Sequence, residues 1–208
     1  MIVLIDSDLD GTVAAAALAV RYGWPYRLSA AATVLASEDE ILLHAADADT
    51  VPNVRGALLA TPAPIVALAS PAWLAATDWS AQGYVAAVEW HRLSADLPGV
   101  IAEWRHDTRL ATIERLAATF GAAPIAGLLQ GLRHALEAAL HAPMNMSLVE
   151  EAHRIAGVAG SLGFAALGRH WLRISQRGST IDAGARRATV HALATLDRAK
   201  NCPIFTVF

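Results

Sequence analysis

Residues Glu150 to Phe164 read EEAHRIAGVAGSLGF, and this stretch decides the fold of the second half of the chain. At about 100° of turn per residue, its apolar side chains and those of its neighbours form one narrow stripe along a helix. The stripe consists of Leu148, Ala152, Ile155, Ala159, Leu162 and Ala166. His153 points roughly 140° away from the middle of this stripe. We therefore expect its imidazole to face solvent.

Two glycines lie on the exposed side of this helix, Gly157 one turn after His153 and Gly160 beyond it. Glycine inside a helix costs roughly 1 kcal/mol relative to alanine, so their presence favours a role that needs space. We expect them to give a partner protein access to His153, and this favours a reactive histidine over a surface or capping one. The other seven histidines pair with no cysteine or carboxylate at ligand spacing, so a zinc site is not expected.

Amphipathic segments surround this helix. Helices are predicted over Ile113–Phe120, Ile125–Leu140, Ala165–Arg177 and Ile181–Lys200. Around the His153 helix, and with Ile181–Lys200 as the helix that closes it, they predict a bundle of the four-helix type over residues 110–202.

This pattern resembles the histidine phosphotransfer (HPt) domain of bacterial phosphorelays. The residues that fit are Ala152, His153, Ile155, Gly157, Leu162 and Gly163. The resemblance implies that His153 carries a phosphoryl group between a histidine kinase or a receiver aspartate and a partner response-regulator receiver domain. Such a phosphocarrier has no cofactor of its own, and Mg²⁺ belongs to the partner receiver. The lysine that the family has three residues after the histidine is Ala156 here, which leaves Arg154 and Arg169 to supply positive charge.

The first half alternates strand and helix signals. Strands are predicted at Ile2–Ile5, Tyr26–Ser29, Ile41–Ala45, Ile65–Ala69 and Tyr84–Val88. Helices are predicted at Thr12–Tyr22, Val54–Leu59, Ala72–Trp79 and Leu93–Arg105. Short apolar strands separated by helices are typical of a parallel sheet covered on both faces. Residues 1–105 therefore predict a flavodoxin-like, doubly wound α/β domain.

This order, beginning with MIVLIDSD, resembles a response-regulator receiver domain in degenerate form. His44 stands near the position of the family's phosphoacceptor aspartate, and Asp47 comes too late. Ala69 or Ser70 takes the place of the switch hydroxyl, and Ala87 replaces the family's lysine; the only lysine of the chain is Lys200. We expect this half to serve as a docking, dimerising or regulatory surface.

Two alternatives stay open. Asp8-Leu9-Asp10-Gly11-Thr12 matches the DxDGT motif of haloacid-dehalogenase-type, Mg²⁺-dependent phosphatases, with Asp8 as nucleophile and Asp10 as acid and base. Ser70 would follow a second strand as in that family, but no lysine follows it. In a purely structural interpretation, Asp10 or Thr12 caps the first helix. The second alternative is an interaction scaffold without phosphotransfer, which Ala156 favours.

Composition limits the remaining classes. The chain has 208 residues, 55% of them hydrophobic, and a net charge of −3, which gives no electrostatic case for nucleic acid. The single cysteine, Cys202, fits a reducing compartment. Prolines interrupt the uncharged run from Gly56 to Thr77, so we expect no membrane span and a cytoplasmic protein. The polar stretch Arg105–Arg109 marks the domain boundary, and the apolar tail Pro203–Phe208 can pair with its own domain or with a second subunit in a homodimer.

Overall fold

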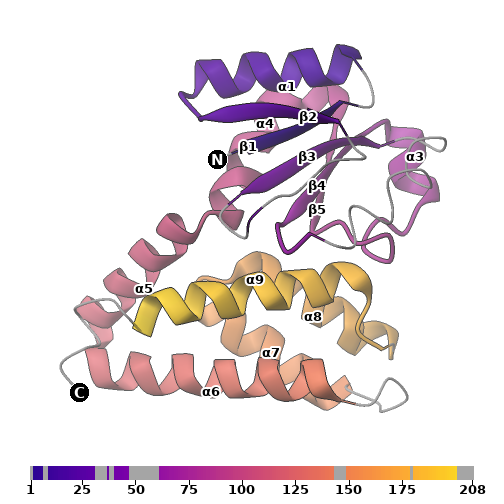
Figure 1. Ribbon diagram of the computed structural model, residues 1–208. Helices are drawn as coiled ribbons and strands as arrows, with labels where there is room; N and C mark the ends of the chain where they lie inside the picture. Colours follow the sequence, from indigo (N-terminus) through magenta and orange to yellow (C-terminus); the bar gives the residue numbers. More distant parts are fainter. Residues whose placement is uncertain are drawn as a thin grey trace. The chain divides into compact units, whose positions relative to one another are not determined.

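The computed structural model describes residues 2–6, 9–30, 37, 40–46, 61–142, 149–178 and 180–200. The chain divides into two compact units, Met1–Ala102 and Glu103–Phe208. The first contains a parallel sheet with helices and the second is helical, so the mixed α/β class predicted from the sequence is confirmed (Figure 1). Within the described ranges, no helix is both long and apolar enough to cross a membrane.

The sheet of the first unit has five parallel strands in the order β2-β1-β3-β4-β5. The strands are β1 (Ile2–Asp6), β2 (Tyr26–Ala30), β3 (Ile41–Ala46), β4 (Ile65–Ala69) and β5 (Ala86–Glu89). Every residue of β3 and β4 is buried, as expected for parallel strands that read as continuous apolar runs. β5 begins at Ala86 instead of the predicted Tyr84.

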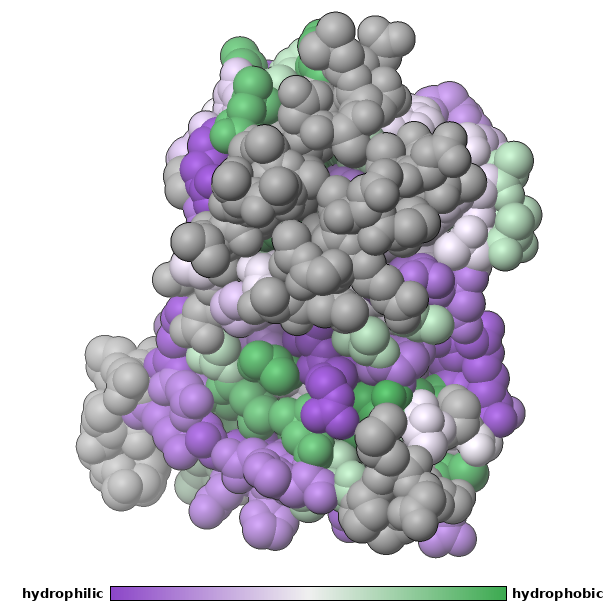
Figure 2. Space-filling view, turned by 45° about the vertical axis from the view of Figure 1, so that its right-hand side comes forward, coloured by the Kyte–Doolittle hydropathy of each residue, from purple (hydrophilic) through white to green (hydrophobic). Residues whose placement is uncertain are grey.

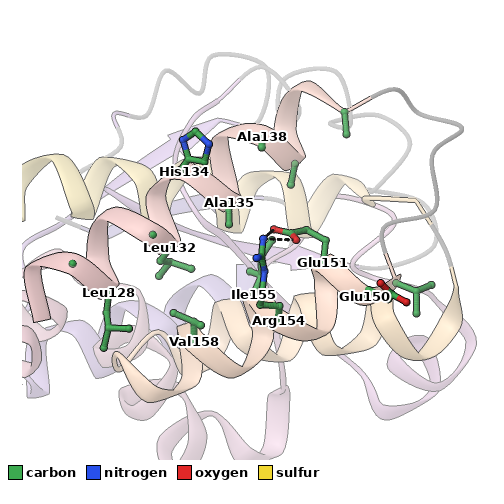
Figure 3. A pocket seen from close by; sticks show the side chains of 15 residues that line it. Leu128, Leu132, His134, Ala135, Ala138, Glu150, Glu151, Arg154, Ile155 and Val158 are labelled. Carbon is green, nitrogen blue, oxygen red and sulfur yellow. Dashed lines mark hydrogen bonds and ion pairs between the residues drawn. The ribbon is translucent and has the colours of Figure 1, made fainter. Parts of the chain in front are cut away.

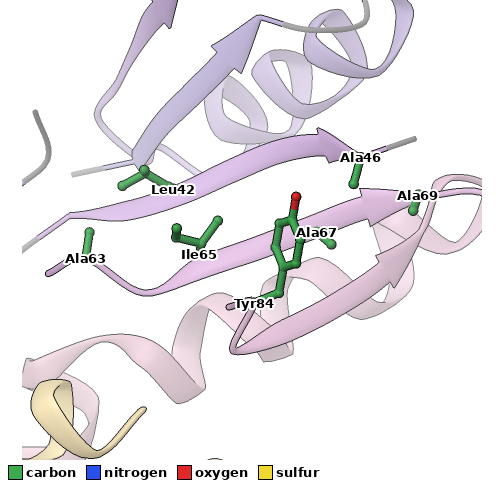
Figure 4. Packing of buried hydrophobic residues seen from close by; sticks show 7 residues of the cluster. All are labelled: Leu42, Ala46, Ala63, Ile65, Ala67, Ala69 and Tyr84. Atoms are coloured by element: carbon green, nitrogen blue, oxygen red, sulfur yellow. The ribbon is translucent and has the colours of Figure 1, made fainter. Parts of the chain in front are cut away.

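Three α-helices of the first unit are described. They are α1 (Leu9–Arg21), α3 (Pro71–Ala76) and α4 (Leu93–Trp104), the last preceded by the 3₁₀ turn η2 (Trp90–Arg92). α1 starts at Leu9 instead of Thr12, and it packs on β1 and β3. The predicted helix Val54–Leu59 lies outside the described residues. One core cluster joins β3 and β4 to Tyr84 (Figure 4), and consists of Leu42, Ala46, Ala63, Ile65, Ala67, Ala69 and Tyr84.

Five helices form the second unit. They are α5 (His106–Phe120), α6 (Ala122–His141), α7 (Val149–Ser161), α8 (Ala165–Arg177) and α9 (Ala183–Lys200). α6 contacts α5, α7 and α9, and α8 contacts α7 and α9. α5 begins at His106 instead of Ile113, so most of the polar stretch predicted as the domain boundary forms its first turn. The tail Pro203–Phe208 lies outside the described residues.

The α7–α8 hairpin is closed by a glycine turn. Gly163 has φ +84°, and the N–H groups of Gly163 and Phe164 donate to the carbonyls of Gly160 and Ala159 at 3.2 and 2.8 Å. These two bonds form a Schellman motif, which satisfies carbonyls that the end of α7 would otherwise leave unpaired. The two helices then approach closely: a Cβ on Gly168 of α8 would lie 3.0 Å from the Ala156 carbonyl oxygen. α7 is therefore held firmly by its neighbour.

Candidate functional site

The site begins with the orientation of α7. Ala152, Ile155 and Ala159 are buried, whereas His153 is exposed. Because these buried positions are three and four residues apart, they face the bundle together and leave the imidazole on the outer side. The predicted orientation of His153 is thus confirmed; Leu148, predicted on the same stripe, lies outside the described residues.

The helix surface after His153 is empty. A Cβ added at either Gly157 or Gly160 would meet no atom within 4 Å, so packing does not require a glycine at either position. The close approach to α8 depends on Gly168 instead, whose missing Cβ admits the backbone of Ala156 and Gly160. Steric access to His153 is therefore wide along this part of α7.

Both arginines predicted to support His153 are engaged in ion pairs. Arg154 donates to both carboxylate oxygens of Glu151, at 2.7 and 2.6 Å, and Arg169 donates to Glu103 at 2.5 Å. The hydrogen bond to Glu151 raises the pKa of Arg154 above its ordinary value. Both guanidinium groups are exposed, and exposed ion pairs contribute little because water screens them. Either arginine can therefore exchange its carboxylate for another anion at small cost.

A buried polar cluster in the same unit was missed by the sequence reasoning. Arg109 is 3% exposed; its Nε donates to the Glu103 carbonyl at 2.8 Å and its Nη1 donates to His191 Nδ1 at 3.2 Å. Its guanidinium lies 4.8 Å from the Trp104 ring and 5.3 Å from the Phe164 ring, in the geometry of cation–π contacts. Only the burial pattern along α9, which the tertiary fold sets, places His191 in this cluster.

The cluster perturbs its two titratable members. Burial first, and then the nearby charges of Arg109, His106 and Arg198, together lower the pKa of His191 to about 2. Burial also lowers the pKa of Arg109, to about 10, while Glu103 opposes that shift. The cluster at neutral pH therefore consists of a charged guanidinium and a neutral imidazole, and it joins α5 to α9.

In the first unit, His44 does not occupy the end of its strand. It lies inside β3, is fully buried, and its Nδ1 is 2.6 Å from the Tyr84 hydroxyl. A buried imidazole bonded to a core tyrosine is not accessible to a phosphodonor, so His44 offers no phosphoacceptor on this unit. Asp47 lies outside the described residues.

The residues of the phosphatase hypothesis are described only in part. Ser70 caps α3, its hydroxyl accepting from the Trp73 N–H at 3.2 Å. Asp10 lies in the first turn of α1, though the structure describes only its backbone, and Asp8 lies outside the described residues. Ala87, predicted to stand at the position of the receiver lysine, packs against the sheet core. Among the described residues, no group of three or more His, Cys, Asp or Glu side chains is arranged to hold a metal ion.

No protein-family model, curated protein or solved structure matches this chain.

Proposed function

We propose that the protein is a cytoplasmic phosphocarrier of a two-component phosphorelay and that His153 accepts and passes on the phosphoryl group. One observation carries this proposal: His153 is exposed on α7, and the helix surface next to it at Gly157 and Gly160 is empty. A histidine with a purely structural role would be expected to be buried or hydrogen-bonded, whereas the His153 ring is exposed and forms no hydrogen bond with a residue that the structure describes.

The fold around the site is compatible with the proposal. α6, α7, α8 and α9 are joined in sequence and pack as neighbours, which is the connectivity expected of the four-helix bundle of an HPt domain. The strand order β2-β1-β3-β4-β5 is that of flavodoxin-like, doubly wound domains, the class to which receivers belong. We assign residues 1–105, which include the first unit, to a degenerate receiver-like domain, followed by an HPt bundle over 110–202.

The chemistry is a reversible phosphoryl transfer. A ring nitrogen of His153 attacks the phosphorus of an aspartyl phosphate on a partner receiver, the P–O bond to the aspartate breaks, and the carboxylate leaves with the electron pair. The ring proton passes to solvent, and the reverse steps deliver the group to the next receiver. Arg154 and Arg169 offset the negative charge of the phosphoryl group by leaving Glu151 and Glu103. The partner receiver supplies Mg²⁺ for the transfer.

The first test uses a small donor, because the natural partner is not identified. The full chain is incubated with radiolabelled phosphoramidate and, separately, with phosphorylated receivers, beside His153→Gln and the control His134→Gln, which removes another exposed histidine. We expect label on the wild type and on His134→Gln alone, stable in alkali and lost in acid. Equal labelling of His153→Gln would contradict the proposal.

An interaction scaffold without phosphotransfer is the second candidate. It is favoured by Ala156, which stands where the family has lysine, and by the ion pairs with Glu151 and Glu103, which occupy the guanidinium groups of Arg154 and Arg169. In that case a receiver binds wild type and His153→Gln with equal affinity, and neither protein carries acid-labile phosphate. Calorimetric titration with one receiver, run beside the labelling assay, separates the two candidates.

A further inference from the structure

α1 has apolar side chains on both its inner and its outer face. Ala15, Leu18 and Ala19 face the core of the first unit. Val13 and Val20, 59% and 67% exposed, lie on the other side of the helix with the exposed Ala17 between them. A surface helix is normally polar on its outer face, and a helix that is apolar all round is normally covered. This outer stripe of α1, Val13–Ala17–Val20, therefore lacks the cover that its composition requires.

The second unit has an apolar groove into which an apolar helix face such as the α1 stripe can pack. A groove of about 1030 Å³ lies between α6 and α7. Figure 3 shows the side chains that line it. The lining is mostly apolar or small, from Leu128, Leu132, Ala135 and Ala138 on α6 to Ile155 and Val158 on α7. Leu128 is 48% exposed at one end of the groove. In the lower half of Figure 2, hydrophobic residues are exposed among the hydrophilic residues of this unit's surface.

His153 is not part of the groove lining, although Arg154, which is proposed to support the phosphoryl group, is. On α7 the lining consists of Val149, Glu150, Glu151, Arg154, Ile155 and Val158. Occupation of the groove does not require a phosphoryl group on His153, although an occupant would contact Arg154.

The charges at the two surfaces are complementary. Arg21 follows the α1 stripe directly and forms no ion pair with any residue that the structure describes; its guanidinium only lies 5.9 Å from the Tyr22 ring. Glu150, at the edge of the groove, is likewise exposed and without an ion pair among the described residues. Glu151 and Arg154 already neutralise one another. Among the described residues, Glu150 is therefore an anion without an ion pair at the edge of the groove, and Arg21 is a cation without an ion pair at the end of the α1 stripe.

The spacings also agree. Eight residues separate Val13 from Arg21 on α1 and Glu150 from Val158 on α7, which is a rise of about 12 Å in each helix. If α1 lies antiparallel to α7, Arg21 meets Glu150 while Val13 meets Val158 and Leu128, which lie together at the other end of the groove in Figure 3. This orientation brings the C-terminal end of α1 to the N-terminal end of α7, where the opposite partial charges of the two helix ends attract.

From these features we infer that the protein self-associates: the outer stripe of α1 from one copy docks in the α6–α7 groove of a second copy, antiparallel to α7. The groove and the stripe are different surfaces, so the contact is heterologous. It produces a closed dimer when two copies exchange it reciprocally and a larger assembly when they do not. In both cases the mass exceeds that of one chain.

Analytical ultracentrifugation of the full chain tests the inference. We expect association in the wild type, and a dissociation constant raised at least about tenfold in Val20→Glu, because the charge would be buried in the groove. Leu28→Glu is the matched control: Leu28 is 61% exposed on β2, outside the stripe, and its replacement should leave association unchanged. A wild type that is monomeric at all concentrations would overturn the inference, as would equal effects of Val20→Glu and Leu28→Glu.

A charge exchange tests the orientation. Arg21→Glu and Glu150→Arg should each raise the dissociation constant about tenfold, and the double variant should return it to near the wild-type value, because the pair is re-formed with reversed signs. Arg186→Glu on the exposed side of α9 is the control. No recovery in the double variant would refute the antiparallel orientation.

Cross-linking identifies the chain to which each surface belongs. In a Cys202→Ser background, chains with Val13→Cys are mixed with chains with Val158→Cys and oxidised. A disulfide-linked species of twice the chain mass, present only in the mixture, is expected. A chain with both Val13→Cys and Val158→Cys is oxidised alongside. If a disulfide forms only within this chain and none forms in the mixture, α1 covers its own groove and the inference is overturned.

Discussion

Acidification below pH 6.5 is expected to destabilise the helical unit through His191. The imidazole is 1% exposed, stacked at 4.2 Å on the ring of His106, and its Nδ1 accepts from the buried Arg109 guanidinium. A proton on Nδ1 would replace this acceptor with a second positive charge. Burial and these charges lower the pKa of His191 from 6.5 to about 2. The folded protein therefore keeps the ring neutral where the unfolded chain protonates it.

The sign and size follow from the linkage between proton binding and folding. Below pH 6.5 the unfolded chain binds one more proton than the folded protein, so the free energy of unfolding falls as the pH falls. The loss is about 1.4 kcal/mol per pH unit, which gives about 2.7 kcal/mol between neutral pH and about pH 4.5. Above pH 6.5 both states hold the ring neutral, and the contribution is constant.

Urea denaturation followed by circular dichroism, at a series of pH values from about 7.5 to about 4.5, measures this loss. His191→Gln keeps an acceptor for Arg109 but cannot titrate. Its free energy of unfolding should fall less steeply, by about 1.4 kcal/mol per pH unit below pH 6.5. His134→Gln, an exposed histidine, is the control and should retain the wild-type slope. Parallel curves for wild type and His191→Gln would refute the reasoning.

Three further predictions concern single side chains. Gly168→Ala should lower the free energy of unfolding by about 1 kcal/mol, since its Cβ would press on the Ala156 carbonyl, whereas Gly160→Ala, with open space, should raise it by up to about 1 kcal/mol; thermal melts compare the two. Gly157→Phe should leave the melting temperature nearly unchanged and should block labelling of His153 by a phosphorylated receiver but not by phosphoramidate. Equal labelling of the variant by both donors would show that Gly157 does not provide access for the receiver. Ser70→Ala should cost about 1 kcal/mol because α3 loses its cap, while Ser70→Asp, which keeps a cap, should not.

Much of the local structure follows from the spacing of apolar residues. The interval of three and four residues in Ala152, Ile155 and Ala159 is enough to place α7 and to turn His153 outward, because a helix has one geometry. The apolar runs of β3 and β4 indicate buried parallel strands, because a strand covered on both faces is apolar at every position. The polar stretch Arg105–Arg109 shows the limit of this reasoning: it was interpreted as the boundary between the two halves, and its polarity did not indicate that α5 begins at His106 or that Arg109 is buried.

The sequence by itself determined the mixed α/β class, the bundle helices and the outward direction of His153, because these depend on contacts between residues near one another along the chain. Only the tertiary structure decided which distant residues meet. Arg109 and His191 are 82 positions apart and pair only because α5 packs on α9. Likewise, Gly168 is needed only because α8 returns against α7, and the α6–α7 groove exists only where two helices diverge. Burial, charge and surface shape at these places depend on packing between elements, which periodicity along one element does not encode.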